Sequence, residues 1–277
     1  MLTRETMGAL ALAILWVNTL LVAAAAWKEI AKLSAKRRAL GDVLHGKVVR
    51  GEGEGGAVAE LVIEQVGRMG GTAEKPAILF FDKTFASVAR GGAIAVDGGA
   101  TEIAIERGAD VEVWLSKGDV ERAGACASQR AFDDALVHAR KAKGWSRTLV
   151  AKVCSGSEVW FAGALEATGA RATAREGALI ASFDPRGWIA GKLAMVAAFI
   201  AIEIGVAALT TALALHAPVF GPISTAGGAL GLAFFLLVQP AGTAVRDATR
   251  FPNVRFARGA WSREAAPAVD LVMKTIA

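Results

Sequence analysis

An acidic residue inside an apolar run is the position in this sequence best placed to do chemistry. Glu203 is the one charged residue in the run from 193 to 215. A carboxylate at the centre of a membrane span costs about 2.5 kcal/mol or more, so such residues usually face a partner or move protons or ions. We expect a protonated Glu203 that hydrogen-bonds to Ser224, Thr225 or a sister subunit. Transport by an oligomer is the alternative.

Two glycines with helical spacing lie in the following apolar run. Gly227 and Gly231 form a GxxxG pattern, which lets two helices approach closely because no side chain keeps them apart. The preceding run ends only a few residues earlier, so we expect the pattern to pack the two runs of one chain together. Contact between two chains, in a homo-oligomer, is the alternative.

The remaining chemistry-bearing residues form no recognisable catalytic or metal-binding pattern. Cys126 and Cys154 are the two cysteines, too few for a zinc fold built on several of them. A nucleophilic cysteine would also need a base, and in the block between the apolar runs only His45 and His138 could serve. The chain has no tyrosine. We therefore expect no catalytic residue, no metal and no cofactor.

Two glycine-rich segments raise the question of a phosphate-binding loop. GEGEGG at 51–56 and GGAIAVDGGA at 91–100 lack the GxxxxGK[ST] pattern of a Walker loop. A dinucleotide loop needs its glycines between a strand and a helix, and 51–56 carries carboxylates where phosphate would lie. We expect both segments to be hairpin turns.

Apolar runs place this chain among membrane proteins. Hydrophobic residues make up 54%, charged residues 21%, and the mean hydropathy is +0.43. The run 7–27 is uncharged and long enough for a hydrocarbon layer of about 30 Å. A cleaved signal peptide is the alternative, but this run is longer than the usual core of a signal. With 193–215 and 219–239 it predicts three spans, the last two in a tight hairpin.

Basic residues are concentrated after the first and third apolar runs and before the second. By the positive-inside rule this places the N-terminus outside, the block 28–187 in the cytosol and the tail from 243 in the cytosol. Anionic lipid could also bind these clusters. The soluble block has no dense basic face, so no nucleic-acid partner is expected. The flanking residues are Lys28, Lys32, Lys36, Arg37, Arg38, Arg186, Lys192, Arg246, Arg250, Arg255, Arg258 and Arg263.

Between the first two spans the hydrophobic period changes to that of short strands. We expect a mainly antiparallel β domain, a sandwich or small barrel, with one helix capped by Ser128 and ending near Lys143. The fold class is thus an α+β membrane protein. The expected divisions are an anchor at 1–40, the β domain at 41–187, a transmembrane hairpin at 188–242 and a basic tail at 243–277. The expected strands are 44–50, 57–66, 77–82, 92–97, 101–107, 111–116, 147–153, 158–165 and 178–183.

Three segments of this block carry a resemblance to a known family. They are LHGKVVRGEG (44–53), WSRTLVAKVCSGSEVWFAGALEA (145–167) and ALIASFDPRGWI (178–189). Together with spans on both sides, they resemble the GIDE-type domain of membrane ubiquitin ligases, which also occurs in bacterial proteins. The resemblance implies a β-rich domain held between spans in a bacterial inner membrane.

The chain departs from that family where its ligases carry catalysis. A RING domain needs eight cysteine or histidine ligands, and the sequence after the hairpin has neither residue. We therefore expect no ubiquitin-ligase activity. The leading hypothesis is a non-catalytic scaffold that binds a membrane or cytosolic protein, or lipid, at the cytosolic face. The alternatives are an accessory of a ubiquitin-ligase-like membrane system with catalysis elsewhere, and an oligomeric transporter subunit that uses Glu203.

Overall fold

The chain forms two compact units in the computed structural model. One combines residues 1–39 and 186–250, and the other combines 40–185 and 251–277. We call them the helical unit and the β unit. The residues that the structure describes are 4–141, 143–168, 171–174, 177–216, 222–249 and 260–266.

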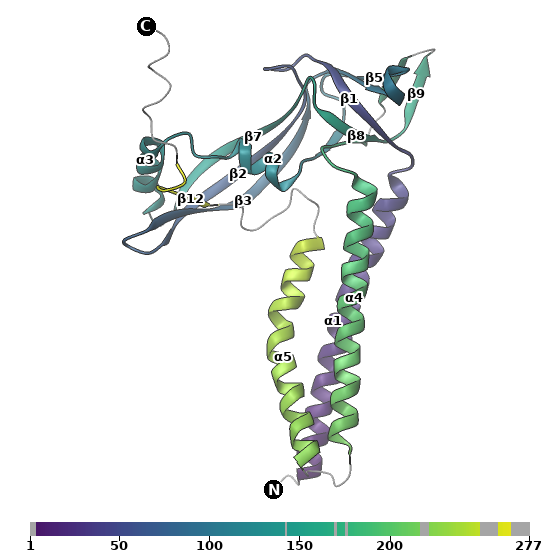
Figure 1. Cartoon of the computed structure of the whole chain (residues 1–277), viewed down its shortest axis with the longest axis vertical. Coiled ribbons are helices and arrows are strands. Elements are labelled where there is room, and N and C mark those ends of the chain that lie inside the picture. Colours follow the sequence, from purple (N-terminus) through teal and green to yellow (C-terminus); the bar gives the residue numbers. More distant parts are fainter. Residues whose placement is uncertain are drawn as a thin grey trace. The chain divides into compact units, whose positions relative to one another are not determined.

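Three helices make up the helical unit. They are α1 (Arg4–Ala39), α4 (Pro185–Ala214) and α5 (Pro222–Thr249). Figure 1 shows α1 and α4 side by side in opposite directions, and the indole N–H of Trp16 donates to the hydroxyl of Thr211 across them at 2.9 Å. The expected hairpin turn at 216–218 lies largely outside the described residues.

Two of these helices are long and apolar enough to cross a membrane, namely Thr6–Ala39 and Pro185–Ala214. The described apolar part of α5 is shorter, Pro222–Phe234. Large apolar side chains on all three helices are exposed, among them Leu21, Ile202 and Leu232. Such a surface is unfavourable in water and suits hydrocarbon. The length of these two helices and their exposed apolar side chains favour association with a membrane, in agreement with the composition.

Two β-sheets make up most of the β unit. The order β6-β11-β8-β1-β4-β5-β10-β9 forms one sheet, and β12-β3-β2-β7 forms the other. Most neighbours are antiparallel, as predicted, but β5–β10 and β6–β11 are parallel pairs. The strands are β1 (Val43–Gly51), β2 (Ala57–Gly71), β3 (Pro76–Ala89), β4 (Gly92–Val96), β5 (Thr101–Ile105), β6 (Val111–Trp114), β7 (Trp145–Cys154), β8 (Glu158–Ala162), β9 (Leu165–Thr168), β10 (Arg171–Ala174), β11 (Ala178–Ala181) and β12 (Ala260–Ser262).

All nine predicted strands form, but segment 51–56 and the start of segment 91–100 are not hairpin turns. The end of the second segment, 97–100, is the predicted hairpin turn, because it joins the antiparallel neighbours β4 and β5. Segment 51–56 carries the chain from β1 in the first sheet to β2 in the second, and Gly91 and Gly92 carry it back from β3 to β4. A Cβ on Gly51 would lie 2.1 Å from the carbonyl oxygen of Gly56. Glycine is therefore required here because two backbones meet where the chain changes sheets.

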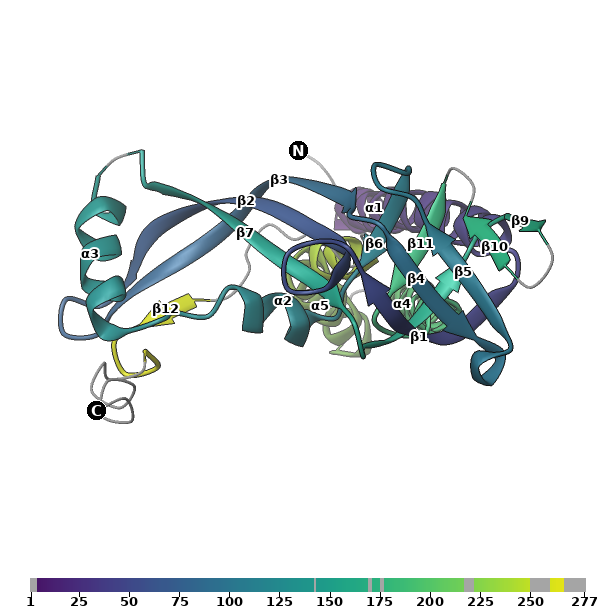
Figure 2. The ribbon, with the colours of Figure 1, turned by 90° about the horizontal axis from the view of Figure 1, so that it is seen from above.

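The β unit has two hydrophobic cores. The larger fills the space between the two sheets, with Leu61, Ile94 and Phe161 among its fully buried residues. The smaller gathers Ile78, Phe80 and the apolar face of one helix. In Figure 2 this helix, α3, lies with β12 at one end of the long strands β2 and β3.

The expectation of one helix in this unit is wrong, because the described residues contain two. The predicted helix is α3 (Gln129–Ala139), capped by Ser128, whose hydroxyl accepts from the backbone N–H of Ala131. The second is α2 (Lys117–Ala123). With only Val120 buried, it lacks the apolar stripe by which helices are predicted. The pairing of β12 with β3 was also unforeseen.

Candidate functional site

Glu203 lies inside the helical unit. It is 2% exposed, and neither carboxylate oxygen has a hydrogen-bond partner among the described residues. Two turns further along α4, the hydroxyl of Thr210 is also buried without a partner in the described part of the chain. Ser224, one of the expected partners of Glu203, donates instead to the carbonyl of Ala214 at 2.8 Å. In the single chain the helical unit itself covers the carboxyl of Glu203.

The two glycines of the GxxxG pattern face α4. A Cβ on Gly227 would lie 2.7 Å from Cβ of Leu213, and one on Gly231 would lie 2.6 Å from Cγ2 of Thr210. Real side chains do not approach that closely, so both positions need glycine for α5 to pack where it does. In the structure the two glycines therefore form a contact between α5 and α4 of the same chain.

The two cysteines lie apart and are not joined. Cys154 ends β7, and Cys126 lies between α2 and α3, where its thiol donates to the carbonyl of Ser128 at 3.2 Å. Among the described residues, histidine, cysteine, aspartate and glutamate form no group of three or more that could hold a metal ion.

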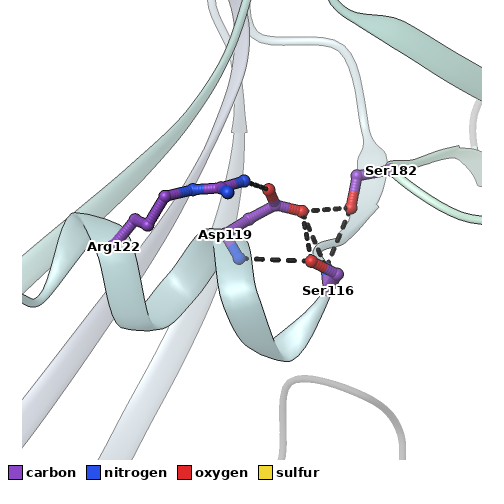
Figure 3. A network of polar contacts seen from close by, with 4 residues as sticks. All are labelled: Ser116, Asp119, Arg122 and Ser182. Carbon is purple, nitrogen blue, oxygen red and sulfur yellow. Dashed lines mark hydrogen bonds and ion pairs between the residues drawn. The ribbon is translucent and has the colours of Figure 1, made fainter.

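A polar network joins the start of α2 to the end of β11. The carboxylate of Asp119 accepts from the hydroxyls of Ser116 and Ser182, each at 2.6 Å, and from Arg122 at 2.5 Å (Figure 3). Ser116 also accepts from the backbone N–H of Asp119, which completes a capping box. The network explains how α2 begins and how its first turn is tied to the end of β11.

The pKa of the Asp119 carboxyl reflects opposing influences. Burial acts to raise the pKa, but hydrogen bonds from Ser116, Ser182 and Arg122 favour the charged form and outweigh it. The pKa therefore lies below its usual value, and the carboxylate is charged at neutral pH.

The richest group of functional side chains surrounds a pocket of about 320 Å³ in the β unit. Gln65, Phe80, Cys126, Arg147 and Trp261 are among its lining residues. They come from β2, β3, the segment before α3, β7 and β12, so five separate parts of the chain meet here. This volume is at the lower end of pockets that hold small groups or side chains.

Arg147 is the central charge of this pocket. Its Nε donates to Oε1 of Gln65 at 2.9 Å, and Nη1 donates to the carbonyl of Gly124 at 3.1 Å. Gln65 in turn donates to Asp82 at 2.7 Å, which fixes the amide orientation. Burial lowers the pKa of Arg147 to about 10, which still leaves the guanidinium charged at neutral pH.

Aromatic rings enclose the guanidinium. Its carbon lies 3.6 Å from the ring centre of Phe80 and 4.5 Å from that of Trp261. Trp261 also contacts Phe80 at 5.0 Å and Trp145 at 5.6 Å between ring centres. A desolvated cation over aromatic faces is worth about 2 kcal/mol, so this group forms a rigid platform.

Of the residues with candidate chemistry in the sequence, Cys126 alone lines the pocket. Trp145 contacts the lining residue Trp261 but does not itself line the pocket. The sequence did not mark Arg147 as a site residue, because the guanidinium of an arginine on a strand normally points to solvent. Trp261 lies far away in sequence, in the tail.

Comparison of the chain with protein-family models, with curated proteins and with solved structures finds no match. The resemblance to the GIDE-type domain therefore gains no support from these comparisons. The site has to be interpreted from its own geometry.

Proposed function

We propose that this protein is a membrane-held recruitment unit whose β unit binds another protein at the cytosolic face. The observation that carries the proposal is the site around Arg147, where the indole of Trp261, from the extended segment 260–266, packs on the guanidinium and forms part of the pocket wall. Arginine and tryptophan dominate the binding energy of protein interfaces. A pocket built from both suits a protein ligand.

The proposed arrangement in the membrane has three spans, with the β unit and the tail on the same side. The pairing of β12 with β3 supports this arrangement. If α4 crosses the membrane, the chain must cross again before β12 can reach a strand of the β unit. In that case α5 is the third span.

The proposal keeps the GIDE-type character and the bacterial inner membrane as its context. The tail has no RING ligands, so the protein would act through a partner that supplies catalysis or through recruitment alone. Spans on both sides of the β unit would confine it near the bilayer and raise its effective concentration for other membrane proteins.

The test is to recover a tagged copy from native membranes and identify what it retains by mass spectrometry. We expect a stoichiometric partner that is lost with Arg147→Ala and kept with Arg140→Ala, a change of an exposed arginine on the same unit. Thermal unfolding of both variants shows whether they remain folded. Recovery of the chain alone, as a defined homo-oligomer, would contradict recruitment.

A further inference from the structure

Segment 260–266 lies on the β unit as a bound peptide lies on a strand-addition site. β12 pairs antiparallel with β3, with Trp261 opposite Ile78 and Ser262 opposite Ala77. In strand addition, backbone hydrogen bonds supply affinity, and pockets for alternate side chains supply specificity. At the site around Arg147 one such side chain, the indole of Trp261, packs against the guanidinium and forms part of the pocket wall.

The indole is the anchor of this segment. Its ring lies against Phe80, Trp145 and the guanidinium of Arg147, and its N–H donates to the carbonyl of Gly124 at 2.8 Å. Both the apolar ring and its single polar group therefore have partners. Tryptophans contribute most to binding at an interface when both the ring and the N–H have partners in this way.

A second, smaller contact follows the anchor along the segment. Ala266 is 4% exposed and packs in the small core with Ile78, Phe132 and Ala139. The segment therefore contacts the β unit at two main positions, through a large aromatic side chain and through a small buried one.

The ion pairs of the segment contribute much less. Arg263 reaches Asp133 at 3.3 Å, and Glu264 reaches Lys75 at 3.6 Å. All four side chains are about half exposed or more, and exposed pairs of this kind are worth about 0–1 kcal/mol. The recognition therefore depends on the backbone, the indole and the buried alanine.

The element that holds the segment is short. β12 has three residues and lies at an edge of its sheet, whereas its neighbours β2 and β3 have 15 and 14. An edge element with few backbone bonds opens at far lower free energy than the strands beneath it. Once opened, it leaves the edge of β3 and the pocket ready for another strand.

We propose that the groove along β3 and the Arg147 pocket dock an extended segment of a partner protein. That segment carries a tryptophan between two small residues, as Trp261 stands between Ala260 and Ser262, and an alanine five positions later. Segment 260–266 is the tethered occupant that the partner displaces. This inference rests on the proposed function and names the chemical class of its partner.

The direct test uses a fluorescent peptide with the sequence of residues 258–268 and the full chain in detergent. The tethered segment competes at an effective concentration of the order of millimolar, so the wild-type chain should bind weakly. Trp261→Ala removes the tethered anchor, and the peptide should bind this variant at least tenfold more tightly. Trp160→Ala, a tryptophan of the other sheet, should bind like the wild type.

Two outcomes of the peptide experiment would overturn the inference. One is equal binding to the wild-type chain and to Trp261→Ala. The other is equal binding to Trp261→Ala of a peptide whose tryptophan is replaced by alanine. Cross-linking of wild-type chains through exchanged tails would assign the groove to a second copy of this chain and would equally overturn docking of a different protein.

A second measurement needs no variant. Hydrogen exchange of the unaltered chain should be faster for the amides of β12 than for those of the middle of β2, because displacement requires opening of the edge. Equal protection would show a permanent strand and contradict the inference. If the peptide binds but native membranes yield no partner, the proposed recruitment is wrong and the docking site is supported. If a partner is retained but the peptide does not bind, recruitment is supported and the docking site is wrong.

Discussion

At the scale of single residues, the buried carboxyl of Glu203 and the partly buried guanidinium of Arg147 are in opposite situations. The guanidinium of Arg147 has a hydrogen-bonded amide, a carbonyl and two aromatic faces. The carboxyl of Glu203 has no hydrogen-bond partner within the ranges that the structure describes. A satisfied buried charge can define a site, whereas an unsatisfied one lowers the stability of the unit that contains it.

Replacement of Glu203 by an apolar residue of similar shape should therefore stabilise the helical unit. We expect Glu203→Met to raise its stability by about 1–3 kcal/mol, because the cost of burying an unpartnered polar group disappears. Thermal unfolding in detergent measures the effect. Ile204→Met, a change at the neighbouring exposed position, should leave the midpoint unchanged.

The opposite result at Glu203 would also be informative. A lower midpoint for Glu203→Met would mean that the carboxyl has a hydrogen-bond partner in the membrane. If the midpoint rises while a cellular phenotype is lost, the carboxyl is kept for function at a cost in stability.

At the scale of elements, α2 shows how a short helix can depend on its cap. The helix has seven residues and buries only Val120, so packing contributes little to it. The capping box of Ser116 and Asp119 and the bond from Ser182 tie its first turn to the end of β11. Each such cap contributes about 1 kcal/mol.

Through the carboxyl of Asp119, this network makes the stability of the β unit depend on pH. The folded-state pKa of Asp119 lies below its unfolded value, so its contribution is fully present above the unfolded pKa, near 4. The contribution is lost as pH falls through the folded pKa. We expect Asp119→Ala to lower the thermal midpoint at pH 7 and to differ progressively less from the wild type below about pH 4.

A charge change on the same helix provides the control for Asp119. Glu121 forms an exposed pair with Lys117 at 3.5 Å, so Glu121→Ala should cost a few tenths of a kcal/mol at most. A constant difference between wild type and Asp119→Ala from pH 7 to pH 3 would show that the carboxylate charge is not what stabilises the cap.

At the scale of the whole molecule, connectivity constrains the arrangement in the membrane. The chain enters the β unit from α1 and leaves it through α4, so the unit as a whole should lie on one side. The hairpin end of α4 should lie on the other side, at Leu215, which is 63% exposed. The strand pairing of β12 requires segment 260–266 to share the side of the β unit.

A membrane-impermeant maleimide tests this arrangement in intact cells. In a background of Cys126→Ser and Cys154→Ser, a cysteine at Leu215 should react from outside, and one at Asp133 or Arg263 only after permeabilisation. Labelling of Arg263→Cys from outside, with Asp133→Cys protected, would exclude a third crossing and with it the docking of the tail on β3.

The sequence by itself determined the local elements of this protein. Long apolar runs predicted α1 and α4, alternation predicted β5, and Ser128 predicted the start of α3, because each depends on neighbours within a few residues. Glycines marked the places where the chain turns. Whether they join strands of one sheet or of two depended on pairing between distant strands.

Only the tertiary structure decided what those elements bring together. Trp261 and Arg147 are more than a hundred residues apart, and nothing local distinguishes this tryptophan from the others. The contact between them exists because β12 completes a sheet edge next to β3 and because burial of the indole outweighs the cost of ordering a short segment. Such long-range pairing leaves no periodic trace in the sequence, so the candidate site became visible only in the folded chain.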